Sequence, residues 1–428
     1  MDQNAFMQSL LRSNIALAVG CTEPVAVALA AAKAKEILGT IPTTVTFKLS
    51  KNIIKNAMGV GIPGTHMLGL PIAIALGTVA GKSSDALSVL SRCLSSLDEA
   101  KQWLADATLN IECRETPEKL YIECIAENGE NHSKVVIRHT HTHFSEIEYN
   151  GQSLTTCQEN ITDEPSVHDN PDDYILSFRS IYDYACNVPL NEIAWLLTMA
   201  QTNLKASNEG LSRDYGLRLG KTFIQNSEHN IQRRVIARTC AAVDARMDGA
   251  TTPVYSNSGS GNQGLTCSLP IYTFAEEYGI TDEERIAKAL ALCNLVSIYI
   301  KKHIGRLSAL CGVVNASVGI ACGMVYLQNG SFEQMVFAVK NLVNSITGML
   351  CDGAKPSCSL KVAMGIHAAF DAVELALHNI VVDETDGLAE QDVDRTILNL
   401  AKIGSHGMNE TDDVILDIMT HKQTIPCK

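Results

Sequence analysis

The stretch KLYIECIAENGENHSKVVIRHTHTHFSEIEYNG, residues 119–151, decides the fold class of this chain. Within it, residues 119–127 and 134–151 alternate apolar with polar side chains and are rich in β-branched and aromatic residues. Successive side chains of a strand point to opposite faces of a sheet, so this alternation predicts half-buried strands. The segments TVTFKLS, residues 44–50, and LNIEC, residues 109–113, share this pattern. We therefore expect a sheet in the N-terminal third.

Helical periodicity surrounds these strands. Residues 5–19, 68–79 and 85–105 carry apolar side chains at helical spacing, and so does almost everything after residue 172, for example residues 283–303 and 363–380. The fold class predicted from this order is α+β. A large, predominantly α-helical domain has a smaller domain of the α/β-sandwich type inserted near the N-terminus.

The domain boundaries follow from the same patterns. A chain of 428 residues exceeds the length at which single cores usually stop growing, so more than one domain is expected. Residues 1–39 read as N-terminal helices that break at Gly20 and pack on the helical domain. Residues 40–155 form the α+β domain, and the polar, acidic residues 156–172 form a linker. Residues 173–428 form the helical domain.

Charge and composition exclude several classes of protein. The 47 acidic residues outnumber 34 basic ones, the formal charge is -13, and no basic run could follow a nucleic-acid backbone. The first residues lack a signal-peptide pattern, so we expect a cytoplasmic protein. Leu307–Leu327 is free of charge but rich in glycine and serine, which favours a buried helix over a membrane span. A homodimer is a possible assembly.

A glycine pattern, G-x-G-x-x-G, occurs at Gly259–Gly264. Polar residues and Pro253 precede it and Pro270 follows, so it lacks the strand and helix of a dinucleotide site. The remaining interpretation is a polar loop that holds a small anion such as a carboxylate. An ordinary surface loop is the alternative. The candidate contacts are Asn257, Ser258, Ser260, Asn262 and Gln263.

Histidines give weaker signals. His139, His141 and His143 in HTHTH would share one face of a strand, but three adjacent positions on one strand are an unusual way to build a zinc site. A solvent-facing strand is the favoured interpretation. His66 lies in the glycine-proline turn GIPGTHMLGLP, a plausible but unspecific site position.

Two cysteines share the loop MLCDGAKPSC, where Cys351 and Cys358 flank a glycine and a proline. Cys311 lies upstream in LSALC, where a helix is expected to begin. None of these spacings is C-x2-C, which disfavours a zinc ribbon or a thioredoxin-type pair. Iron-sulfur clusters take thiolates from separate turns of a fold, so cluster ligation remains open. The chain has 14 cysteines, and most of the others, including Cys322, are expected to be reduced core residues.

Four separated motifs carry a family resemblance: GCTEPVA at 20–26, DARMDGATTPVYSNSGSGNQG at 244–264, RLSALC at 306–311 and MLCDGAKPSCSLKV at 349–362. In this order they resemble the cysteine desulfidase family, which includes serine-dehydratase-like bacterial proteins, over nearly the whole chain. The chain is more distantly similar to the alpha chain of iron-sulfur L-serine dehydratases. Those dehydratases have a C-D-P-V loop followed by a further cysteine. In this chain Gly353 replaces the proline of that loop, and the interval between the two loop cysteines is shorter.

The resemblance implies a lyase that uses a 4Fe-4S cluster with one open iron and no pyridoxal phosphate. Its substrate would be a small amino acid: L-cysteine, converted to pyruvate, ammonia and sulfide. The alternatives are L-serine dehydration by the same cluster and a non-enzymatic iron-sulfur redox sensor. A pyridoxal-phosphate lyase using Lys355 or Lys361 is disfavoured, since no phosphate-binding segment accompanies either lysine.

The resemblance also assigns roles to residues. Cys311, Cys351 and Cys358 would bind the cluster, and Cys21 would transfer a proton or be a transient fourth ligand. Glu23 is the competing base, or only a carboxylate at a helix start. Thr22 and the five polar residues of 257–263 would contact the substrate, and Arg246 would pair with a carboxylate of the substrate or form a structural ion pair. Cys427 reads as a dangling thiol near the chain end.

Overall fold

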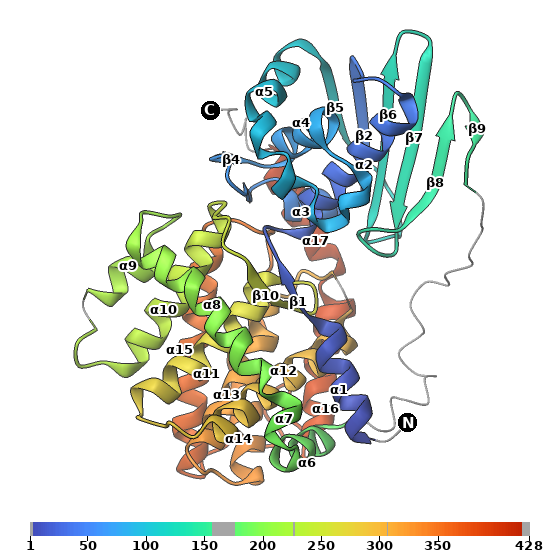
Figure 1. The fold of residues 1–428 in the computed structure, drawn as a ribbon. Coiled ribbons are helices and arrows are strands. Elements are labelled where there is room, and N and C mark those ends of the chain that lie inside the picture. Colours follow the sequence, from blue (N-terminus) through green and yellow to red (C-terminus); the bar gives the residue numbers. More distant parts are fainter. Residues whose placement is uncertain (1–2, 156–175, 226, 306, 422–428) are drawn as a thin grey trace.

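The computed structural model describes residues 3–155, 176–225, 227–305 and 307–421. The predicted linker at 156–172, Arg306 and Cys427 lie outside these ranges. The chain forms a sheet domain, from α2 to β9, and a helical domain, which contains α1, β1 and the helices from α6 onward (Figure 1). The predicted α+β class with a large helical part is confirmed.

The sheet domain is built on one six-stranded sheet with the order β5-β2-β6-β7-β8-β9. Only β2 and β5 run parallel, and the other neighbours are antiparallel. Helix α2 packs on β6 and β7, and α4 packs on α2. The strands are β2 (Thr44–Leu49), β5 (Thr108–Cys113), β6 (Tyr121–Asn128), β7 (Asn131–Arg138), β8 (Phe144–Tyr149) and β9 (Gln152–Ser153).

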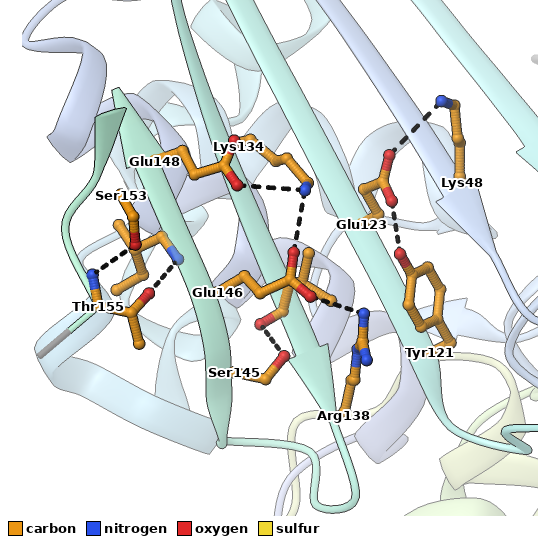
Figure 2. A network of polar contacts seen from close by, with 12 residues as sticks. Lys48, Tyr121, Glu123, Lys134, Arg138, Ser145, Glu146, Glu148, Ser153 and Thr155 are labelled. Carbon is orange, nitrogen blue, oxygen red and sulfur yellow. Dashed lines mark hydrogen bonds and ion pairs between the residues drawn. The ribbon is translucent and has the colours of Figure 1, made fainter. Parts of the chain in front are cut away.

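Charged side chains cover the sheet face that α2 leaves open. Lys134 pairs with Glu146 at 2.9 Å and Arg138 pairs with the same carboxylate at 2.7 Å (Figure 2). Glu123 accepts a hydrogen bond from Tyr121 and pairs with Lys48 at 3.5 Å. Oppositely charged neighbours across strands stabilise a sheet modestly. This face is therefore polar, and the sheet buries its apolar residues on the α2 side.

The histidine run does not continue a strand. Strand β7 ends at Arg138, and His139 adopts a positive φ of 64° in the turn that leads to β8. The prediction that His139, His141 and His143 share one strand face is wrong. Arg138 N donates to the His143 carbonyl at 3.2 Å, which closes a tight hairpin that the alternating pattern concealed.

The N-terminal segment also differs from expectation. Residues 5–19 were predicted as one helix, but α1 (Gln3–Asn14) gives way to β1 (Ile15–Ala18), which pairs antiparallel with β10 (Val254–Asn257). Helix α1 packs on α12, as expected for the helical domain, whereas α2 (Thr22–Leu38) packs on the sheet. The expectation that both N-terminal helices pack on the helical domain is therefore wrong for α2. Its alanine-rich surface is buried almost all round, between the sheet and α4.

Short helices connect the strands. After β2 come α3 (Lys51–Ala57) and a small hairpin of β3 (Gly61–Ile62) and β4 (Met67–Leu68), followed by α4 (Leu70–Ala80). The predicted helix at 85–105 is continuous only as α5 (Leu97–Asp106). Before α5 the chain makes 3₁₀ turns at Ser83–Ser88, Leu90–Arg92 and Leu94–Ser96. Serine side chains compete for backbone hydrogen bonds, which disfavours a regular helix there.

The helical domain packs around α13 (Gly312–Leu327), which contacts four other helices, α11, α12, α14 and α15. Its small residues allow close approach: a Cβ added at Gly319 would overlap the carbonyl oxygen of Cys293 on α12. The predicted buried helix in this charge-free stretch is thus confirmed, and Cys322 within it is fully buried. In the described ranges, no helix has the length and apolar character needed to cross a membrane.

The helices around α13 complete this domain. They are α6 (Phe178–Asn187), α7 (Leu190–Ile193), α8 (Trp195–Ser212), α9 (Leu219–Ile224), α10 (Ile231–Met247), α11 (Gly261–Glu277), α12 (Glu283–Ile304), α14 (Phe332–Ile346), α15 (Cys358–Leu377), α16 (Val393–Lys402) and α17 (Asn409–His421). Helix α17, the last helix of this domain, packs on α3 of the sheet domain. Figure 1 shows α17 and the β1–β10 pair where the two domains meet.

Candidate functional site

The four sequence motifs meet where the two domains join. Arg246, near the end of α10, donates to the Gly20 carbonyl and to Asn262 Oδ1, both at 3.0 Å. It thereby links the loop before α2 to the first turn of α11. A Cβ at Gly312 would lie 2.9 Å from Gln263 Oε1, so the start of α13 reaches the same place. Segments far apart in sequence therefore form one site.

Backbone pairing sets the positions of two of the three predicted ligand cysteines. Leu310 and Leu350 form an isolated antiparallel bridge. Cys311 N donates to the Met349 carbonyl at 3.0 Å, and Cys351 N donates to the Ala309 carbonyl at 2.6 Å. Cys311 and Cys351 thus lie on two short antiparallel segments, one residue beyond the Leu310–Leu350 bridge on each. The loop of residues 349–358, here the cysteine loop, carries Cys358 to the start of α15.

Three of the candidate cysteines lie at helix starts. Cys311 is the N-cap of α13, Cys21 is the N-cap of α2, and Cys358 is the first residue of α15. The N-terminus of a helix carries a partial positive charge and unpaired N–H groups. Each thiol therefore lies where a negative charge is favoured. This arrangement suits thiolate ligands or a bound anion.

A glycine allows the cysteine loop to approach the sheet domain. Gly353 has a φ of +88°, a region that favours glycine. A Cβ there would lie well under 3.0 Å from the carbonyl oxygen of Lys55 on α3. Helix α3 therefore packs with its backbone directly on the loop. The Gly353 that departs from the C-D-P-V pattern has a physical reason in this fold.

The thiols are buried and interact electrostatically with one another. Burial, together with Cys351 and Cys358, raises the pKa of Cys311 far above its usual range. Burial also raises the pKa of Cys358 to about 11, and the neighbouring Cys351 adds to this. Cys311 and Cys358 therefore hold their protons at neutral pH. Binding of a metal group would release those protons, because thiolates are the ligands.

Lysines surround the same thiols. Lys361 pairs with Asp352, and although burial opposes the charge, this pairing raises the pKa of Lys361. Asp352 also pairs with Lys355 at 3.2 Å. Lys301, in the last turn of α12, lies close enough to Cys311 and Cys351 to interact electrostatically, and desolvation of its ammonium lowers its pKa to about 8. Among the described residues no carboxylate forms an ion pair with Lys301, and its electrostatic partners include Cys351 and Cys311.

Cys21 and Arg246 lie in contact. Burial raises the pKa of the Cys21 thiol, and the Arg246 guanidinium opposes this increase. The positive end of α2 favours a negative charge at this position, but the cost of burying that charge is larger. Both residues are at least nine-tenths buried. Cys21 therefore rests as a protonated thiol.

Glu23 is oriented by its neighbours. Asn56 Nδ2 on α3 donates to Glu23 Oε1 at 3.1 Å, and Thr22 Oγ1 donates to Glu23 Oε2 at 3.2 Å. The residue is only partly buried. A Cβ at Gly353 would also approach the Cα of Asn56, at 3.3 Å. Asn56 of α3 therefore lies between Glu23 and the cysteine loop.

The predicted polar loop at 257–263 is a strand, a turn and a helix start. Ser260 is the N-cap of α11, and its Oγ accepts from Gln263 N. Asn257 Oδ1 accepts from Gln263 Nε2 at 2.9 Å and from Ser258 Oγ at 2.8 Å. The prediction of a loop is wrong for residues from Gly261 on. Since β10 pairs antiparallel with β1, the dinucleotide interpretation remains excluded.

These hydrogen bonds occupy several of the predicted substrate contacts. Asn257 and Gln263 are buried and also bonded to α12, through Asn294 Oδ1 at 2.8 Å and Ser297 Oγ at 3.0 Å. The partly exposed members of the set are Ser258, Ser260 and Asn262. The network fixes α11 against α12 and positions Gln263 beside Gly312.

The thiols of Cys311, Cys351 and Cys358 have the donor chemistry of an iron-sulfur site and not that of a single-metal site. In the described ranges no three His, Cys, Asp or Glu side chains gather closely enough to hold one metal ion. An iron-sulfur cluster makes a different demand, because its thiolate ligands bind different irons. Three mutually interacting thiols at two positive helix ends, with lysines beside them, have the donor chemistry that such a cluster takes.

Sequence reasoning missed several residues of this site. Asn56 and Lys301 gave no signal, because an asparagine and a lysine on helices look like solvent-facing residues. Asp352, Lys355 and Lys361 gave a signal that we did not use for binding: charges of both signs inside and just after the cysteine loop. His66 is exposed, with a φ of 56°, in the turn before β4.

Comparisons with known proteins place the chain among relatives of unstated activity. The serine dehydratase alpha chain family matches residues 86–417. A UPF0597 protein of Parabacteroides distasonis is 46% identical over 422 residues, which cover 96% of this chain and 97% of the relative. One of Bacteroides fragilis is 45% identical, with 97% of both chains covered. One of Clostridium perfringens is 39% identical, with 96% of this chain and 97% of the relative covered. The names of these three UPF0597 proteins do not state a reaction.

Proposed function

The chain belongs to the serine dehydratase alpha chain family, and on that premise we propose that it is a lyase that eliminates the β-substituent of a small amino acid. The proposed substrate is L-cysteine. Loss of the Cα proton and of the Cβ–S bond gives sulfide and 2-aminoacrylate. Water then converts 2-aminoacrylate to pyruvate and ammonia, a step that needs no further catalytic group.

We propose that Cys311, Cys351 and Cys358 hold a 4Fe-4S cluster. When bound, such a cluster supplies a Lewis-acid iron that polarises a substrate oxygen or accepts a leaving thiolate. The observation that carries the proposal is the antiparallel bridge between Leu310 and Leu350, which holds the segments of Cys311 and Cys351 together, with Cys358 at the start of α15. This bridge fixes the backbone that carries the two cysteines, and Cys311 interacts electrostatically with both Cys351 and Cys358.

The chain's own residues supply the proton transfer. Removing the Cα proton requires a base within hydrogen-bond reach of it, and such a base accelerates the step by roughly 10²- to 10⁴-fold. Glu23 is the better candidate because Asn56 and Thr22 hold its carboxylate in place. The buried Cys21, whose pKa is raised by burial, is better suited to donate a proton than to accept one. Arg246 holds the Gly20 carbonyl and so fixes the start of α2, which carries both residues.

The test is turnover by anaerobically purified, full-length protein whose iron and acid-labile sulfide have been quantified. We expect sulfide and pyruvate from L-cysteine in proportion to cluster content. Cys351→Ala should lose both the cluster and the activity. Cys113→Ala is the matched control, since Cys113 is an exposed thiol on β5, and it should keep both. A protein that has no iron after reconstitution, or that is active without it, would refute the proposal.

L-serine is the second candidate substrate, because the matched family is described as serine dehydratase alpha chain. The same proton removal would then expel hydroxide instead of sulfide, and pyruvate would appear without sulfide. Parallel assays with the two amino acids distinguish these reactions. Pyruvate from L-serine, with no sulfide from L-cysteine, would establish the dehydratase.

A further inference from the structure

A cavity of about 460 Å³ opens between the cysteine loop and α17. Leu350 from the loop and Ile415, Ile418 and Met419 from α17 form its apolar wall. Its charged lining consists of Asp352, Lys355 and Lys361. The sequence assigned none of these residues to substrate contact. The cavity is thus a separate surface from the polar network of residues 257–263.

The charged residues form a compact arrangement. One oxygen of the Asp352 carboxylate pairs with Lys361 and the other pairs with Lys355, at 3.2 Å. The single carboxylate thereby holds two ammonium groups side by side, and each lysine side chain is 22% exposed. An ammonium group has three N–H donors, and Asp352 uses one on each lysine. Asp352, Lys355 and Lys361 together have a net charge of +1, and each ammonium group has N–H donors that Asp352 does not use.

This local charge contrasts with the rest of the chain, whose formal charge is -13. A cleft whose lining has a net charge raises the local concentration of ligands of the opposite sign. Carboxylates are bound well by oriented, partly desolvated ammonium groups, because charge-assisted hydrogen bonds are about twice as strong as neutral ones. The cavity is therefore suited to one carboxylate. Its apolar wall from α17 offers no partner to a second carboxylate, which disfavours acidic amino acids.

The cavity is also next to the thiols. Leu350 and Asp352 flank Cys351 in the chain, and Lys361 interacts electrostatically with both Cys311 and Cys351. A group bound to Lys361 from the cavity therefore lies beside the cysteine loop. The buried side chains Asn257 and Gln263, by contrast, are already bonded to each other.

Building on the proposed function, we propose that this cavity binds the α-carboxylate of the small amino-acid substrate through Lys355 and Lys361. Arg246, which the sequence suggested as a substrate contact, then has a structural role, because its two described hydrogen bonds join Gly20 to Asn262. In the unliganded protein Asp352 pairs with both ammonium groups and competes with the substrate carboxylate for them. An incoming carboxylate shares them or displaces it.

The experiment measures binding without turnover. L-alanine has the same carboxylate as the substrate and no leaving group, and L-alaninamide is its uncharged counterpart at that position. Ligand-detected NMR titrations with the full-length, cofactor-free protein should show L-alanine binding at least about tenfold more tightly than L-alaninamide. Lys361→Met and Lys355→Met should each weaken L-alanine roughly tenfold. Lys402→Met, at an exposed lysine of α16, is the matched control and should change nothing.

A second variant distinguishes a binding role from a structural ion pair. Asp352→Asn removes the competing carboxylate, so L-alanine should bind at least as tightly as to the unmodified protein. If the ion pairs of Asp352 with the two lysines are only structural, Asp352→Asn should instead weaken the binding of L-alanine. The inference is overturned if L-alanine does not bind, if both lysine variants bind it normally, or if Arg246→Met alone abolishes binding. Circular dichroism of each variant checks that it is folded.

The same variants separate this inference from the proposed function. If the lysine variants lose L-alanine binding while the reconstituted protein eliminates neither sulfide nor water, the carboxylate site stands and the reaction is wrong. If elimination proceeds with an unchanged KM in both variants, the reaction stands and the site is wrong.

Discussion

Replacing Gly353 with alanine tests the contact on which the site depends. Two costs add at this position. The φ of +88° is unfavourable for a residue with a Cβ, by about 1–2 kcal/mol. The new methyl group would also overlap the carbonyl oxygen of Lys55, a backbone atom that cannot rotate away, which costs about 1–3 kcal/mol by analogy with overpacked cores. We expect Gly353→Ala to lower the free energy of unfolding by about 2–5 kcal/mol.

Two other glycines supply matched controls. Gly39 has a φ of +78° with nothing within 4 Å of an added Cβ, so Gly39→Ala should show the backbone cost alone. Gly348 has neither a positive φ nor a neighbour within 4 Å, so Gly348→Ala should change stability by less than about 0.5 kcal/mol. Urea titrations followed by circular dichroism, compared at equal m-values, give the three numbers. If Gly353→Ala costs no more than Gly39→Ala, then α3 does not press on the cysteine loop and the reasoning fails.

Three further variants test other contacts of the same region. Lys55→Met breaks the buried ion pair with Asp412 and should cost of order 3 kcal/mol in urea titrations, whereas Lys51→Met, whose partners are exposed, should cost less than about 1 kcal/mol. Asn56→Ala frees the Glu23 carboxylate and should lower kcat roughly 10- to 100-fold at nearly unchanged stability; an unchanged kcat would contradict the assignment of Glu23 as base. Although burial opposes it, pairing with Lys361 and Lys355 lowers the pKa of Asp352 below its usual 3.8, so its stabilising contribution is complete above pH 3.8 and lost as pH falls through the lower folded value. Asp352→Asn should therefore flatten the dependence of stability on pH below 3.8, and a curve parallel to that of the unmodified protein would exclude this contribution.

The sequence was informative where a short-range pattern has one physical meaning. Alternation of apolar and polar residues predicted β2, β5 and β6 within a residue or two, since one face of that sheet is buried against α2. The same pattern misled at HTHTH, because a tight turn also accepts alternating polar residues. Serine-rich residues 83–96 had apolar spacing typical of a helix, but local hydrogen bonding favoured 3₁₀ turns.

The candidate site was partly predictable for a different reason. Its cysteines and Arg246 lie in motifs of a known family, so their importance could be inferred although their contacts could not. The roles of Asn56, Lys301 and Lys361 depend on which helices approach one another. Nothing in the residues 51–57 of α3 predicts that its backbone lies on a glycine about 300 residues later in the chain. Similarly, the short β1 strand is defined by its partner β10 and not by its own four residues.

Helix α3 explains why neither domain contains the site alone. Its seven residues make three contacts with different partners: the Lys55 carbonyl lies on Gly353, the Lys55 ammonium pairs with Asp412 of α17, and Asn56 holds Glu23. The thiols and the cavity belong to the helical domain, whereas the candidate base belongs to the sheet domain. A shift of α3 would therefore move the base relative to the thiols and change the packing of α17, which lines the carboxylate cavity. Because these contacts share one short helix, substitutions at Gly353, Lys55 and Asn56 should not act independently, as expected for residues coupled through a common backbone element.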